Sequence, residues 1–189
     1  MTFELSRLSL VVHYVCALCS HHPGRLDVQK LHRILWLADG QTYASLGKAI
    51  VGEEYTRGAD GPMAMHLDGA LRELEQQDHL SIRAYGARQE YLARGVPDIS
   101  AISSDARRIL DQIIREVTEG DEFQVADNVK PGSWVSRAYE QSFEWQFEHT
   151  WEVGEPGEPI PYQQHALLKF QPLTPEDENW IRLELENLK

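Results

Sequence analysis

Apolar residues recur at helical spacing in two stretches near the start of the chain, residues 3–20 and 27–47. Asp27 suits the N-cap of the second helix, and Gly47 suits the left-handed position that follows a helix. The buried stripe of the first helix is expected at Leu5, Leu8, Val12, Val15 and Cys19. The second helix carries an apolar face and also a polar and aromatic stripe of His32, Trp36, Asp39 and Tyr43. Because two of its faces carry such residues, we expect this helix to be central.

The pattern changes twice after the second helix. Residues 49–56 read as an extended segment, and Gly61 and Pro62 are expected to begin a third helix, since proline tolerates the first helical turn. Residues 80–93 alternate as two short strands around Gly86, which predicts a hairpin. Helical spacing returns over residues 104–119 and in an amphipathic helix at the end of the chain.

These elements predict a mainly α (α+β) fold: one compact helical domain with one or two small β-hairpins and an aromatic-rich C-terminal segment. A chain of 189 residues fits a single domain. Val96 and Pro97 mark an internal boundary. Residues 1–97 form a near-neutral half of helices and hairpin, and residues 98–189 form an acidic half with the terminal helix.

The acidic charge is concentrated in the second half of the chain. Residues 1–97 carry 10 Lys and Arg against 11 Asp and Glu, whereas residues 98–189 carry 8 against 19, so balances of −1 and −11 give the net −12. Such a field repels phosphate backbones and attracts basic partners, so we expect no direct nucleic-acid binding. Solubility alone is the other explanation of the same charge.

Aromatic side chains gather in residues 130–162, which are otherwise irregular. They form either a layer that packs on the helical core or a recognition surface, because aromatics ringed by acids suit protein interfaces. As a recognition surface, the candidate contacts are Trp134, Tyr139, Phe143, Trp145 and Trp151. Tyr55 and Arg57, beside the Gly61–Pro62 turn, are a second candidate.

Motifs of catalysis and of metal binding are missing from the sequence. It contains neither a glycine-rich phosphate loop nor a GxSxG elbow, and Cys16 and Cys19 lack the second ligand pair that structural zinc needs. We therefore expect no enzyme, no cofactor and no metal site. A deep polar pocket, or a metal near Cys16 and His21, would favour a hydrolase or transferase instead. The longest apolar run, residues 8–19, is too short to cross a bilayer, so we expect a cytoplasmic protein.

The block from Lys30 to Pro62 resembles the signature of the Panacea antitoxin domain, the SocA-like family of phage-associated proteins. That pattern joins a KLxKLLYFAD helix to a small-G-[KR] turn, a G-x-x-[FY] strand and a G-P restart. The matching residues include Lys30, Leu31, Leu35, Trp36, Asp39, Tyr43, Gly47, Gly52, Tyr55, Gly61 and Pro62. A family tail, a tryptophan followed by a G-E-x-I-[PS]-Y loop, is matched by Trp151, Gly157, Glu158, Ile160, Pro161 and Tyr162.

The resemblance implies an α-rich domain that neutralises a separate protein toxin by direct binding, and the acidic half suits a basic toxin. An adaptor that delivers a client protein to a protease is one alternative. A winged-helix regulator is another, although the stretch that would read DNA carries Arg72 against Asp68, Glu73, Glu75 and Asp78. Most of the matching residues in the 30–62 block have packing or turn roles, so the binding surface is expected elsewhere.

Overall fold

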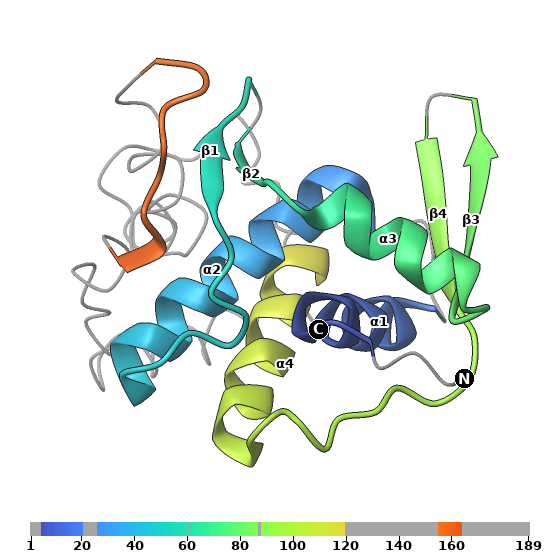
Figure 1. Ribbon diagram of the computed structural model, residues 1–189, viewed down its shortest axis with the longest axis horizontal. Helices are drawn as coiled ribbons and strands as arrows, with labels where there is room; N and C mark the ends of the chain where they lie inside the picture. Colours follow the sequence, from blue (N-terminus) through green and yellow to red (C-terminus); the bar gives the residue numbers. More distant parts are fainter. Residues whose placement is uncertain (1–4, 21–25, 60, 87, 120–154, 164–189) are drawn as a thin grey trace, which may run out of the picture.

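Helix α2 (Val28–Leu46) runs through the middle of the protein, with the other helices packed around it (Figure 1). The computed structural model describes residues 5–20, 26–59, 61–86, 88–119 and 155–163. As predicted, Asp27 caps α2 by accepting a hydrogen bond from the backbone N–H of Lys30 at 2.8 Å. Gly47 follows the helix in the left-handed conformation, at a φ of 71°. The predicted central place of this helix is confirmed.

Helix α1 (Arg7–Cys19) buries the stripe that its sequence predicts. Four of the five predicted residues, from Leu8 to Cys19, are buried, and Leu5 packs against the same core from its edge. The hydroxyl of Ser6 caps the helix by accepting from the backbone N–H of Ser9. The Ser9 hydroxyl in turn donates to the Glu73 carboxylate on helix α3 (Leu67–Gln76), so a partly buried polar contact joins the two helices.

The third helix does not begin at Gly61 and Pro62, and this prediction is wrong. Pro62–Ala64 form strand β2, which pairs antiparallel with strand β1 (Tyr55–Arg57), and α3 begins only at Leu67. In the ladder, Pro62 lies opposite Arg57, next to the pair in which Gly58 donates to the carbonyl of Gly61 at 3.0 Å. Hydrogen-bonded and non-hydrogen-bonded pairs alternate in an antiparallel ladder, so Pro62 occupies a non-hydrogen-bonded position. The Pro62 nitrogen therefore faces away from β1, where its missing N–H removes no ladder bond.

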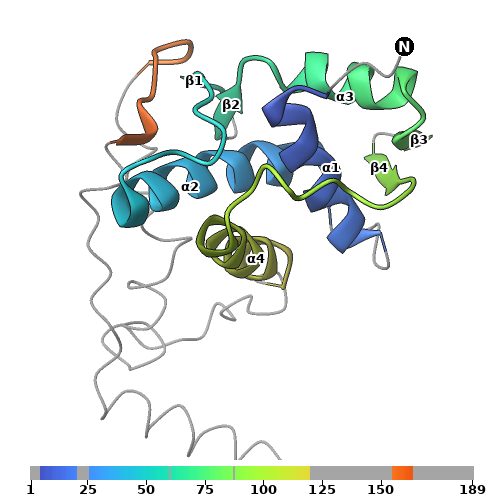
Figure 2. The same cartoon turned by 60° about the horizontal axis from the view of Figure 1, so that its bottom comes forward.

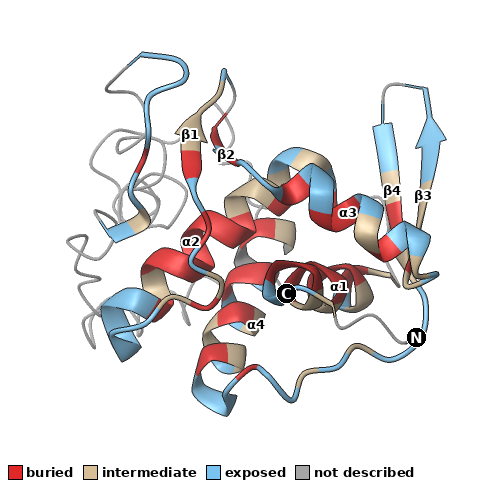
Figure 3. Ribbon diagram, in the orientation of Figure 1, coloured by how far each residue is buried: buried red, intermediate tan, exposed pale blue. Residues whose placement is uncertain are grey.

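The second hairpin is present where the sequence predicts it. Strand β3 (Leu80–Tyr85) pairs with β4 (Arg88–Ala93) in the register Leu80↔Ala93 to Tyr85↔Arg88. Its base contacts α1 and α3, and its tip is exposed (Figure 3). Gly86 lies in the turn with a φ of 62°, which glycine adopts without strain.

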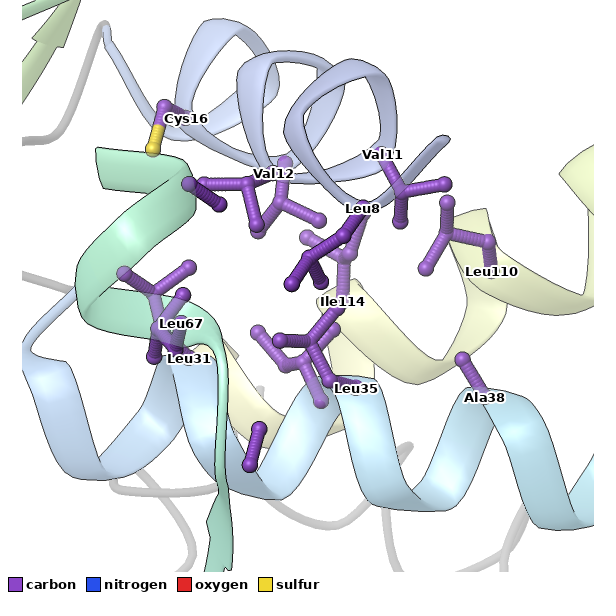
Figure 4. Packing of buried hydrophobic residues seen from close by; sticks show 14 of the residues in the cluster. Leu8, Val11, Val12, Cys16, Leu31, Leu35, Ala38, Leu67, Leu110 and Ile114 are labelled. Carbon is purple, nitrogen blue, oxygen red and sulfur yellow. The ribbon is translucent and has the colours of Figure 1, made fainter. Parts of the chain in front are cut away.

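Helix α4 (Ser104–Glu119) crosses beneath α2 (Figure 2) and has the predicted bounds. Its buried side chains meet α1 and α2 in one hydrophobic cluster (Figure 4), to which it contributes Ala106, Leu110, Ile113, Ile114 and Val117. Residues on both sides of Pro97 thus share a core. With its helices and two small antiparallel sheets, the described part of the chain is α+β as predicted. The aromatic-rich C-terminal segment and the terminal helix lie outside it.

Among the described residues, no helix has the length and apolar character that crossing a bilayer requires.

Candidate protein-binding surface

A third extended segment lies along the free side of β1, from about one hundred residues further down the chain. Gly157 donates to the carbonyl of Arg57 at 2.7 Å, Arg57 donates to that of Glu158 at 2.9 Å, and Ile160 donates to that of Tyr55 at 2.8 Å. Thr56 and Pro159 form the bridge between the two segments. We call β1, β2 and residues 157–160 the signature sheet (Figure 1). It joins the two separate stretches on which the family resemblance depends.

The carboxylate of Asp39 anchors this sheet to α2. It is fully buried and accepts hydrogen bonds from the backbone N–H groups of Val51, Gly52 and Glu53 at 2.7–3.1 Å. The hydroxyl of Tyr55 donates to the same carboxylate at 2.8 Å. Because all these donors point at one carboxylate, its charge is compensated without a cation.

The turn before the sheet is held by a second side chain of α2. Thr42 is buried, donates to the carbonyl of Ala38 at 2.6 Å and accepts from the backbone N–H of Ile50 at 2.9 Å. Gly52 has a φ of 79°, a conformation that favours glycine and turns successive N–H groups toward Asp39. Thr42 and Asp39 therefore fix both ends of the segment that leads into β1.

Three tyrosines tie the 157–162 segment to α2. The ring of Tyr162 packs edge-on against Tyr55 at 6.3 Å and against Tyr43 at 5.9 Å between centroids. Burial raises the pKa of Tyr55 well above 10, and the nearby Asp39 charge raises it further. Tyr55 thus stays protonated and keeps donating to Asp39.

The matching residues of the 30–62 block fill packing, capping and turn positions. Leu31, Leu35 and Trp36 are buried, and Tyr43 is half exposed under Tyr162. Gly61 lies in the β1–β2 turn at a φ of 139°, and Pro62 follows it in β2. The backbone N–H of Lys30 donates the N-cap hydrogen bond to Asp27.

The structure describes only some of the predicted contact residues. Trp134, Tyr139, Phe143, Trp145 and Trp151 lie outside the described residues. Tyr55 is 3% exposed, so its side chain supports the sheet from inside, and Arg57 is half-buried. Met63 and Met65, which are 47% and 55% exposed on β2, are not among the predicted contacts. Their alternation with Pro62 and Ala64 is a strand pattern that the helix prediction overlooked.

A histidine–carboxylate pair lies beside Met65. Nδ1 of His66 is 2.6 Å from Oε1 of Glu53, and the carboxylate also accepts the backbone N–H of Glu54 at 3.0 Å. The His66 side chain is 69% exposed and that of Glu53 only 6%. The hydrogen bond to Glu53 raises the pKa of His66 above 6.5.

A pH titration followed by NMR should therefore give His66 a pKa above 6.5, and Glu53→Gln should lower it toward that value. Because the folded-state pKa is raised, the stabilisation is complete below the unfolded-state pKa and is lost as pH rises through the folded-state pKa. The exposed Asp105→Asn, far along the chain on α4, is the control and should leave the titration unchanged. A His66 pKa at or below 6.5 in the unaltered protein contradicts the pair.

No group of three or more metal-ligating side chains occurs within residues 5–20, 26–59, 61–86, 88–119 and 155–163. Cys16 and Cys19 are free and buried in the core, where free cysteine packs as a small hydrophobe. Burial raises the pKa of both thiols, that of Cys19 to about 11. His21 lies outside the described residues.

Both cysteines should accordingly resist iodoacetamide at pH 8 in the folded protein and react fully in denaturant. The reagent needs an accessible thiolate, and burial removes both accessibility and charge. Mass spectrometry before and after unfolding measures the difference. Rapid labelling of Cys16 in the native protein would contradict its buried position.

The polar groups of this region bind one another. Asp39, Thr42 and Tyr55 all hydrogen-bond to the backbone or to each other. These side chains therefore hold the signature sheet in place.

Comparison of the chain with models of protein families, with curated proteins and with solved structures found no match.

Proposed function

We propose that the protein is an antitoxin-like binding protein that neutralises a protein toxin by direct contact in a toxin–antitoxin system. The observation that carries the proposal is the meeting of the two resembling stretches. Residues 55–57 and 157–160 hydrogen-bond to each other across about one hundred residues of chain. A pattern whose distant parts hydrogen-bond to each other is under a common structural constraint, and this supports the resemblance to the Panacea domain.

The charge distribution supports binding, and the buried acid of the signature supports the family resemblance. The acidic character of residues 98–189 suits a basic toxin. Asp39, the most deeply buried acid of the signature, is fully engaged by backbone donors and Tyr55. A residue so engaged acts as an anchor of the fold. We place the protein in the cytoplasm together with its toxin.

Co-expression with the product of the adjacent gene tests this function. We expect this protein to relieve growth arrest caused by that product and to copurify with it as a stable complex. The amount of the toxin should stay unchanged, whereas an adaptor that feeds a protease would shorten its half-life. Persistent growth arrest with both proteins folded and present would refute neutralisation.

A further inference from the structure

The outer face of the signature sheet exposes apolar side chains. Along β2, Pro62 and Ala64 are buried, whereas Met63 and Met65 point outward and are 47% and 55% exposed. Thr56 lies opposite Met63 in the register and bridges to Pro159, which is also exposed. Methionine adapts its shape to different partners, which suits a recognition surface.

Gly58 lets the side chain of Met63 lie flat on the β1–β2 turn. A Cβ atom at position 58 would be 2.6 Å from Sδ and 2.7 Å from Cγ of Met63. Gly58 has an ordinary negative φ, so the absence of a side chain serves this close approach. The position of Met63 on the face is thus set by its neighbour.

Glutamates border the same face. Glu54 is exposed directly before β1, where its carbonyl accepts from the backbone N–H of Met65 at 3.0 Å. Glu155 is exposed at the start of the segment along the other side of β1. An apolar centre with acids around it complements a partner that carries apolar and basic side chains together.

The edges of the sheet are closed to strand addition. On the outer side of β2, Pro62 has no N–H, and the N–H of Ala64 donates to Nδ1 of His32 at 2.9 Å. On the other outer side, Pro159 and Pro161 also have no N–H to donate. A partner therefore meets this sheet through its face.

We propose that the toxin docks on the outer face of the signature sheet, an inference that rests on the proposed function. The face fits a basic, amphipathic segment of the toxin, whose apolar side chains contact Met63 and Met65. Its Lys or Arg side chains contact Glu54 and Glu155.

The first test compares Met63→Ser/Met65→Ser with Tyr85→Ser/Val96→Ser in binding to the adjacent gene's product. The control pair is more exposed, at 59% and 92%, and lies on the β3–β4 hairpin and beyond it. We expect the methionine pair to weaken binding by at least about tenfold and the control pair to leave it unchanged. Met63→Leu/Met65→Leu should keep most of the affinity.

The second test asks whether the charge and the shape of the face both contribute to binding. Glu54→Lys/Glu155→Lys should weaken binding, mainly by slowing association, and should make binding less dependent on salt. The control Glu90→Lys/Asp105→Lys should change neither the affinity nor its dependence on salt. Gly58→Ala should weaken binding because the added Cβ displaces Met63. Equal thermal unfolding midpoints of all variants show that the fold is kept.

The outcomes separate the two proposals. If the unaltered protein neutralises and binds the toxin but the methionine and glutamate variants bind equally well, the docking face is wrong and the function stands. If the unaltered protein neither binds nor neutralises, the proposed function fails and this inference fails with it. A photo-crosslinker in place of Met65 should label the toxin in the complex. Labelling of this chain itself or of a second copy overturns the inference.

Discussion

Replacing Asp39 with alanine is expected to lower the free energy of unfolding by about 3–5 kcal/mol, because buried donors would lose a charged acceptor. The carboxylate accepts from three consecutive backbone N–H groups and from the Tyr55 hydroxyl. When the carboxylate is removed, these donors are left without this acceptor. Urea unfolding followed by far-UV circular dichroism measures the loss. The control is Asp105→Ala, an exposed acid in the first turn of α4, which should cost less than about 1 kcal/mol.

Tyr55→Phe should lower the free energy of unfolding by a smaller amount than Asp39→Ala. It removes only the donor at 2.8 Å and leaves the three backbone bonds to Asp39 in place, so we expect a loss of about 1–2 kcal/mol. Asp39→Asn should fall between the two, since its amide NH₂ would face donors where an oxygen now accepts. Equal and small effects of Asp39→Ala and Asp105→Ala would show that the loop from Val51 to Glu53 finds other acceptors.

The helix ends could be predicted because local chemistry fixes them. Asp27 and Gly47 bracket α2 with an N-cap side chain and a left-handed glycine, and both signals act within four residues. Pro62 does not distinguish a helix from a strand. A proline fits the first turn of a helix, and it also fits a strand position whose nitrogen faces outward. The Gly58–Gly61 turn, which decides between them, depends on pairing with β1.

The candidate site was less predictable than the helices. The spacing of His32, Trp36, Asp39 and Tyr43 showed that α2 is contacted on a second face, but not which groups contact it. The partners of Asp39 lie 12–16 residues further along the chain. The segment 157–160, which pairs with the other side of β1, lies about one hundred residues away, and no local periodicity reports such a pairing. The family resemblance grouped these stretches, and the hydrogen bonds give a physical reason for the grouping.

Shortening Ile113 to alanine should lower the free energy of unfolding by about 2–5 kcal/mol, because the change leaves a cavity between α4 and the rest of the core. Ile113 is 1% exposed and belongs to the cluster that α4 shares with α1 and α2. One turn earlier in the same helix, Ile109 is only partly buried, so Ile109→Ala is a matched control with the same helix propensity change. It should cost about 1 kcal/mol.

The Ile113 variant also tests whether the acidic half can unfold by itself. In a shared core, the cavity weakens α2 as well as α4, so circular dichroism and the His66 NMR signal should report one transition with the same midpoint. The signature sheet is anchored on α2 through Asp39, and His66 reports on that sheet through Glu53. If helix signal were lost while His66 kept its native titration, α4 would be a separable unit. The core around Leu110 and Ile113 would then not hold the signature sheet in place.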